Sequence, residues 1–193
     1  MKEIVFLLEE DSAKAMLDAL LPRILDVQIG FRCIPFEGKQ DLEKQMVKRI
    51  RGYQNPEARF IIVRDQDSHP DCRAVKQRLL EKCHESGKAE SALVRIACRE
   101  LETFYLADLA AVESGLNLSG LKKHQNTRKF RQPDLLISPS LELLKLTKNA
   151  YQKVSGSRKI GKFLDMENTR SLSFRNLVLG IRKQAEMLMA ISG

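Results

Sequence analysis

Two aspartates, separated by a single residue, follow the most continuous apolar run of the chain. The run covers residues 60–63, and Asp65 and Asp67 come shortly after it. A short apolar run predicts a buried strand, so both carboxylates are expected near the end of a strand. Carboxylate oxygens are the ligands that Mg²⁺ takes in proteins. A metal site is therefore one interpretation, and the other is that the aspartates cap a helix that begins near Pro70.

Three glutamates also follow apolar runs. Glu9 comes directly after the run at residues 4–8, and Glu100 and Glu102 follow a strand that we predict at residues 92–98. If a helix began at residue 100, the last two side chains would project about 200° apart. They can both turn toward one ion only if the helix begins after Glu102. A solvated helical turn is the alternative interpretation of this pair.

The predicted elements bring these carboxylates to one place. Strands are expected at residues 4–8, 27–36, 60–63 and 92–98, and helices at residues 12–24, 40–51, 70–85 and 101–112. This alternation predicts an α/β fold, a four-stranded parallel sheet covered by helices on both faces. Parallel strands joined by right-handed crossovers end at one edge of the sheet, where ligands bind in open sheets of this type. We expect the acidic residues there, with Lys39 from the loop after the second strand.

A carboxylate cluster needs a compensating cation, because like charges repel. Mg²⁺ or Mn²⁺ at this edge would activate water and stabilise the leaving oxygen in phosphodiester cleavage. Lys39 would stabilise charge on the scissile phosphate, although a surface lysine beside a helix start is an equal alternative. The three histidines and four scattered cysteines form no catalytic or zinc motif.

The positive charge of the chain lies in its C-terminal part. Residues 1–109 contain 18 Lys and Arg against 19 Asp and Glu, whereas residues 110–193 contain 15 against 6. Such asymmetry favours a polyanionic partner, nucleic acid before membrane, over a merely solubilising surface. We predict an α/β domain at residues 1–112 and a basic helical extension packed on it at residues 113–193.

Within the extension, helices are expected at residues 139–151 and 172–191. The segment between them is basic and contains glycines. Lys153, Arg158 and Lys162 would contact nucleic-acid phosphates there through side chains and glycine-exposed backbone N–H groups. A solvated basic loop is the alternative.

Composition limits the class of protein. The 193 residues, 43% of them hydrophobic, suit one globular domain with an extension. No apolar run approaches the roughly 20 residues of a membrane span, and acidic residues follow the N-terminus too closely for a secretory signal. We expect a cytoplasmic protein with no membrane contact and with reduced cysteines. No glycine-rich nucleotide motif occurs, so an ATPase involved would be a separate chain, and a twofold homodimer stays open.

The acidic pattern resembles the Toprim domain of topoisomerases, bacterial primases and nucleases of the overcoming-lysogenization-defect type. In these proteins a glutamate after the first strand and a DxD after the third serve Mg²⁺-dependent phosphodiester chemistry. The resemblance implies that Glu9 is the Toprim glutamate and that Asp65 and Asp67 form the DxD.

A narrower resemblance covers nearly the whole chain. It rests on LLEEDSAKAMLDALLPRIL, FEGKQDL, VRDQDSHPDCRAVKQRL, RIACRELETFYLAD, SPSLELLKLTKNAYQKVSG and NTRSLSF. These are similar to a family of small bacterial Toprim-like proteins, often encoded beside an ATPase and associated with abortive-infection defence against phage. Two departures from the pattern of related proteins bear on whether the site holds one metal ion or two. Glu10 stands where glycine commonly follows the Toprim glutamate, and Ala13 and Lys14 stand where related nucleases place another acid.

We therefore predict a Mg²⁺- or Mn²⁺-dependent endonuclease that hydrolyses nucleic-acid phosphodiester bonds. The expected metal ligands are Glu9, Asp65, Asp67, Glu100 and Glu102, and the expected catalytic residues are Glu9, Asp65, Asp67 and Lys39. One alternative is a non-catalytic subunit that binds nucleic acid or an ATPase. Another is a toxin that cleaves tRNA or another RNA, since phosphate contacts do not separate DNA from RNA.

Overall fold

The predicted four-stranded parallel sheet is confirmed in the computed structural model of the protein, which describes residues 1–190. The strands are β1 (Glu3–Leu8), β2 (Gly30–Pro35), β3 (Arg59–Asp65) and β4 (Ala92–Ala97). All neighbours pair in parallel, in the order β2-β1-β3-β4. The central strands β1 and β3 are buried on both faces, which explains why their sequences are continuously apolar rather than alternating.

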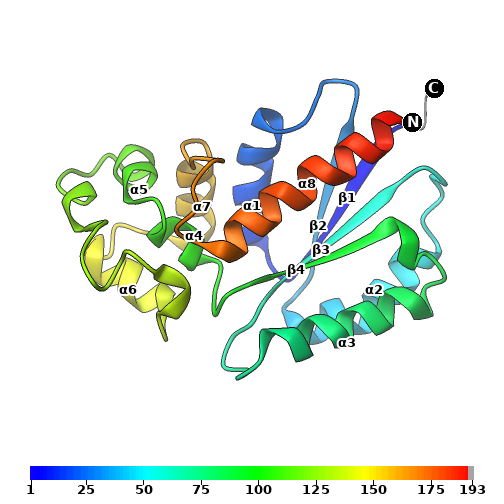
Figure 1. The fold of residues 1–193 in the computed structure, drawn as a ribbon, viewed down its shortest axis with the longest axis horizontal. Helices are drawn as coiled ribbons and strands as arrows, with labels where there is room; N and C mark the ends of the chain where they lie inside the picture. The colour runs from blue at the N-terminus through cyan, green and yellow to red at the C-terminus, as the bar shows by residue number, and fades with distance from the viewer. Residues whose placement is uncertain (191–193) are drawn as a thin grey trace.

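Two helices cover each face of the sheet (Figure 1). Helices α1 (Asp11–Leu20) and α8 (Leu172–Ala190) pack on one face, and α2 (Lys39–Arg51) and α3 (Cys72–Glu85) pack on the other. Successive side chains of a strand point to opposite faces. Accordingly Phe6 joins the core under α1 and α8, whereas Leu7 joins the core under α2 and α3.

The remaining helices form a lobe beyond the carboxyl ends of the strands (Figure 1). They are α4 (Glu102–Leu106), α5 (Leu109–Leu116), α6 (Pro139–Leu146) and α7 (Lys153–Gly161). Helix α7 packs on both α1 and α5. Gly161 allows this approach, because a Cβ atom there would lie 2.7 Å from the Met16 carbonyl oxygen. The division into an α/β domain at residues 1–112 and a basic helical extension packed on it at residues 113–193 stays a prediction.

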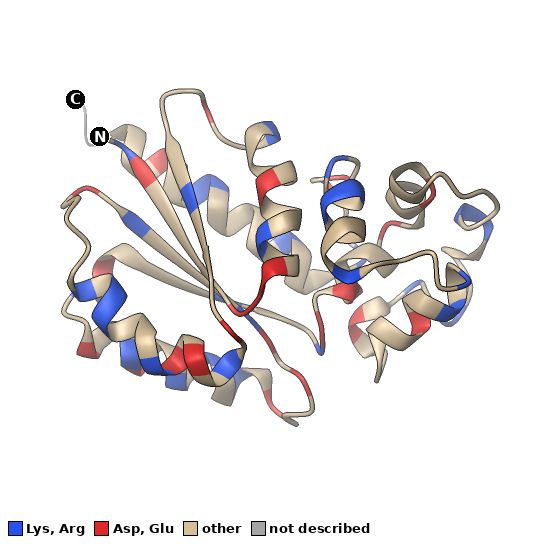
Figure 2. Ribbon diagram, turned by 180° about the vertical axis from the view of Figure 1, so that it is seen from behind, with Lys and Arg blue, Asp and Glu red and all other residues tan. Residues whose placement is uncertain are grey.

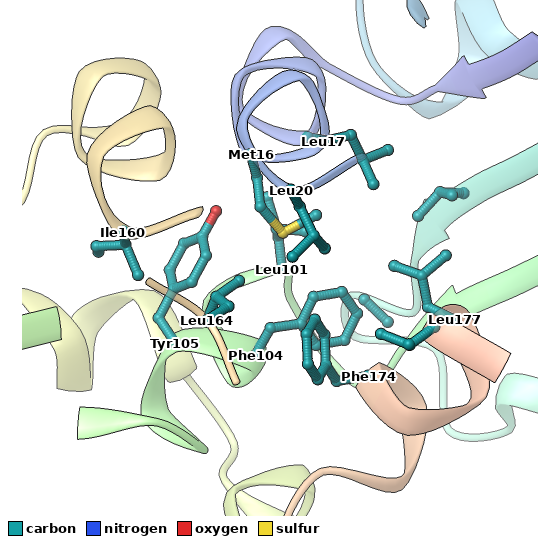
Figure 3. Packing of buried hydrophobic residues seen from close by; sticks show 14 of the residues in the cluster. Met16, Leu17, Leu20, Leu101, Phe104, Tyr105, Ile160, Leu164, Phe174 and Leu177 are labelled. Carbon is teal, nitrogen blue, oxygen red and sulfur yellow. The ribbon is translucent and has the colours of Figure 1, made fainter. Parts of the chain in front are cut away.

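One apolar core joins the lobe to the sheet domain (Figure 3). Side chains from α1, α4, α7 and α8 meet there, and the rings of Phe104 and Phe174 lie 5.2 Å apart. The elements around the carboxyl edge are thus fixed to one another by buried apolar contacts.

Several predicted helices are shorter or broken. Helix α1 ends at Leu20, and a 3₁₀ turn at Leu21–Arg23 follows, because Pro22 has no N–H for the helical ladder. The single helix predicted at residues 101–112 is wrong. It breaks at Asp108, whose carboxylate instead accepts the Ala111 N–H and starts α5.

The extension also differs from prediction. Helix α6 ends at Leu146, and Lys148 and Asn149 take left-handed backbone angles soon after it. The basic segment after Tyr151 forms helix α7 rather than a loop. The predicted end of the last helix at residue 191 lies outside the described residues. Among residues 1–190 no helix has the length and apolar character needed to cross a membrane.

Candidate metal centre

The ends of β1 and β3 place Glu9 beside Asp65. Leu8 is in register with Val63, and the Glu9 N–H donates to the Val63 carbonyl oxygen at 3.3 Å. The Asp65 N–H donates in turn to Glu9 Oε2 at 3.1 Å. Strand pairing therefore fixes these two carboxylates next to each other. Figure 2 shows further acidic residues on the loops at the same edge.

Asp65 lies at the centre of the acidic group. Its Oδ2 accepts the Leu101 N–H at 3.2 Å. Enclosure by the protein raises the pKa of Asp65 well above its usual range, and the negative charges of Glu9, Glu102 and Glu10 raise it further. Full ionisation of this group is therefore unfavourable unless a cation joins it.

Glu9 has a buried counter-charge that does not fully compensate it. The Arg64 Nε lies 3.8 Å from Glu9 Oε2, and its Nη1 lies 2.9 Å from Glu43 Oε1. Burial nevertheless raises the pKa of Glu9, against the lowering by the Asp65 N–H and the Arg64 charge. The arginine is therefore shared between two glutamates and leaves the edge short of positive charge.

Helix α4 begins at Glu102, and this settles how the two glutamates after β4 lie. The Glu102 side chain is buried, and its Oε1 accepts the Tyr151 hydroxyl at 2.9 Å. Burial raises the pKa of Glu102. Glu100 precedes the helix, and its Oε2 accepts the Ser140 N–H at the start of α6, at 2.7 Å. The negative charge of Glu102 contributes to the raised pKa of Asp65, whereas Glu100 accepts a hydrogen bond from the start of α6 in the lobe.

Two lysines pair with the outer carboxylates. Lys39 Nζ lies 2.9 Å from Asp67 Oδ2, and Asp67 itself has a left-handed backbone. Lys153 Nζ lies 2.7 Å from Glu10 Oε2. Burial lowers the pKa of Lys153, but the charges of Glu10, Glu102 and Asp65 outweigh it and the net shift is upward.

The donor set fits a hard divalent cation, although it is not arranged as a finished site. Among residues 1–190, no three His, Cys, Asp or Glu side chains are close enough to hold one ion together. The carboxylates instead face protein donors such as Lys39, Lys153 and Tyr151. Within that same range, Glu9 Oε1 and Asp65 Oδ1 accept no hydrogen bond. All-carboxylate donors and raised pKa values both match Mg²⁺ or Mn²⁺.

The predicted nucleic-acid-binding residues lie on one side of this edge. Lys153 is part of the acidic group itself, while Arg158 and Lys162 are exposed at α7 and just after it. The expected exposure of glycine N–H groups is wrong. The Gly156 N–H donates to the Gln152 carbonyl oxygen inside a helix, and a Cβ atom at Gly156 would meet the Tyr151 ring at 2.6 Å.

Sequence reasoning missed Tyr151. Its hydroxyl joins Glu102 to Ser157, and its ring packs 5.9 Å from that of Tyr105. No periodicity or motif connects Tyr151 with Glu102, which lies 49 positions earlier. Only the packing of the lobe on α4 brings the two together.

The structure is an α/β protein with acidic residues at the strand ends of a parallel sheet, and comparisons with known proteins support this fold class. Residues 8–182 match the family model described as Domain of unknown function (DUF4276), so the chain belongs to that family. A comparison with curated proteins finds no match. The chain is similar to the solved C-terminal region of the Burkholderia pseudomallei OLD protein, with a TM-score of 0.56, 16% identity, and coverage of 94% of this chain and 98% of that one. At this identity the likeness shows the fold, and it confirms the predicted architecture.

Proposed function

We propose that this protein is a metal-dependent endonuclease that hydrolyses phosphodiester bonds of nucleic acid. The observation that carries the proposal is the convergence of Glu9, Asp65 and Glu102 at the carboxyl edge of the sheet, flanked by two lysines. Carboxyl groups with raised pKa values at a ligand-binding edge are candidates for catalysis. The Toprim resemblance and the shared fold with the OLD region support the same assignment.

Each group has a role that its position supports. Glu9, Asp65 and Glu102 would hold Mg²⁺ or Mn²⁺ once their side chains turn toward one ion, and the ion would then supply an activated water and stabilise the leaving oxygen. Lys39 and Lys153 bind phosphate oxygens of the substrate, since each ammonium group reaches the acidic edge and has three donors. Tyr151 orients Glu102 through its hydroxyl.

The substrate backbone and the partners belong to the same proposal. Exposed Arg158 and Lys162 contribute further phosphate contacts next to Lys153. An ATPase partner and a role in defence against phage rest on the family resemblance alone.

The test is cleavage of plasmid DNA and total tRNA by the purified protein with Mg²⁺, Mn²⁺ or EDTA. Asp65→Ala is compared with Glu186→Ala, which removes an exposed carboxylate from α8. We expect cleavage that needs metal, disappears in Asp65→Ala and persists in Glu186→Ala, and the substrate that is cut separates DNA from RNA. Cleavage that survives in EDTA or in Asp65→Ala would refute the metal centre. If a partner ATPase also fails to elicit cleavage, a non-catalytic binding subunit replaces the nuclease.

A further inference from the structure

A surface beside the metal centre takes no part in the chemistry proposed above. It is formed by residues 128–141, which we call the approach segment, and it contains the 3₁₀ turn η4 (Pro133–Leu135) and the start of α6. Helix α6 and η4 pack on α4, where Glu102 lies (Figure 1). The Ser140 N–H donates to Glu100 Oε2 at 2.7 Å, and Asp134 accepts the Ser173 N–H at 3.1 Å. The segment is therefore anchored at a defined place next to the acidic edge.

The approach segment exposes large apolar side chains. Leu135 is 75% exposed, Ile137 83% and Leu141 54%. Three such residues within seven positions contribute little to the core and favour contact with a ligand or partner. Ser140 contacts Glu100 at the acidic edge. Three residues of chain span at most about 11 Å, so Ile137 lies no further from Ser140 than about three nucleotides of one DNA strand extend along the helix axis.

A recess opens next to Leu135. It has a volume of about 370 Å³ and is lined by Arg128, Lys129, Gln132, Leu135 and Leu136. This volume is at the lower end for small-molecule pockets and suits a single nucleotide. The leucines offer apolar surface to the face of a base, and the glutamine amide can both donate to and accept from its edge. Arg128 suits a phosphate, because it has no ion-pair partner among residues 1–190, whereas Lys129 is ion-paired with Glu142.

We propose that the approach segment binds an unpaired nucleotide of the substrate next to the scissile phosphate. Leu135 and Ile137 act as an apolar wedge between bases, and the recess receives the displaced base. The inference rests on the proposed nuclease function and adds the class of substrate, namely nucleic acid with unpaired or unstacked bases. In an intact duplex the base faces are stacked and unavailable to leucine or isoleucine, so binding there must first unstack a step.

Binding is measured in the Asp65→Ala background, so that cleavage does not interfere. The probes are an intact DNA duplex, the same duplex with one unpaired 2-aminopurine, and the labelled single strand. Anisotropy gives the affinities, and 2-aminopurine fluorescence reports loss of stacking. The paired substitution Leu135→Ser with Ile137→Ser is compared with Val27→Ser, since Val27 is fully exposed on the loop before β2.

We expect the bulged duplex and the single strand to bind about tenfold more tightly than the intact duplex, with a rise in fluorescence. The paired substitution should bring this preference below about threefold and leave binding of the intact duplex unchanged, because phosphate contacts are retained. Val27→Ser should change neither the preference for unpaired bases nor the affinity for the intact duplex. Melting by circular dichroism checks that the variants are folded, as expected for exposed positions.

Equal binding of intact and bulged duplexes, absence of binding, or a preference that survives the paired substitution would overturn the inference. A dimer in sedimentation that the paired substitution dissociates would overturn it too, because the wedge would then be an interface between copies. The binding assay needs no cleavage. Failure of the nuclease proposal, seen as no metal-dependent cutting by the wild type, is therefore a separate result.

Discussion

Replacing Asp65 with asparagine should stabilise the metal-free protein and abolish its response to metal. Asparagine has the same shape and retains an oxygen that can accept the Leu101 N–H, which donates to Asp65 at 3.2 Å. The substitution removes the negative charge that burial and the neighbouring carboxylates Glu9 and Glu102 disfavour. We therefore expect the Asp65 carboxylate, which is needed to bind a cation, to lower the stability of the protein when no cation is bound.

The raised pKa of Asp65 determines how the stability of the folded protein changes with pH. The folded protein keeps the Asp65 proton to higher pH than the unfolded chain does, so the associated stability is fully present below the unfolded pKa of about 3.9. It is lost as pH rises from there through the raised pKa, at up to about 1.4 kcal/mol per pH unit. In Asp65→Asn this part of the pH dependence disappears. In EDTA at pH 8 the variant should therefore be the more stable protein.

The expected size can be stated in melting temperature. Removing the disfavoured charge is worth about 1.4 kcal/mol for each pH unit between the unfolded and the folded pKa of Asp65, and each kcal/mol corresponds to about 2–4 °C in a protein of this size. Metal at one hundred times its Kd stabilises the wild type by about 2.7 kcal/mol, or about 5–11 °C. Asp65→Asn should therefore melt at a higher temperature than the wild type in EDTA, and its melting temperature should not rise further when metal is added.

Thermal unfolding is followed by circular dichroism in EDTA at pH 5 and pH 8, and with Mg²⁺ or Mn²⁺ at pH 8. Glu186→Gln, an exposed carboxylate on α8, controls for the loss of a charge elsewhere. The reasoning is refuted if Asp65→Asn melts below the wild type in EDTA at pH 8. It is equally refuted if the wild-type melting temperature does not respond to metal.

Three further substitutions test the surroundings of the centre. Lys39→Ala should slow metal-dependent cleavage at least about tenfold, with less than about 1 kcal/mol lost in urea unfolding, because its ion pair is half exposed; an unchanged rate would exclude Lys39 from catalysis. Lys153→Met should lower the melting temperature in EDTA, because it removes a positive charge that pairs with Glu10. Mg²⁺ should reduce this difference in melting temperature from the wild type by supplying the missing positive charge, and an equal difference in EDTA and in Mg²⁺ would contradict the argument. Gly161→Ala should cost about 1–3 kcal/mol in urea unfolding, because its Cβ would lie 2.7 Å from the Met16 carbonyl oxygen. Gly30→Ala is the control, since its nearest contact would be 3.7 Å, and equal losses in the two variants would contradict the packing argument.

The sequence alone determined the sheet and the acidic residues at its edge. The apolar runs of β1 and β3 predict buried parallel strands, because each is covered on both faces. Residues that directly follow parallel strands lie at the same carboxyl edge of the sheet, independently of the conformation of the loops. For that reason Glu9 and Asp65 could be placed together although 56 positions separate them.

Only the tertiary structure decided which lysine and which hydroxyl complete the centre. Lys153 pairs with Glu10 across 143 positions, and Tyr151 reaches Glu102 across 49. The basic, glycine-containing segment after Tyr151 has the composition of a loop, yet it folds as α7. Its glycines permit close packing on α1 and against the tyrosine ring. Hydrophobic periodicity reports which face of an element is buried, but it does not report which distant element covers that face.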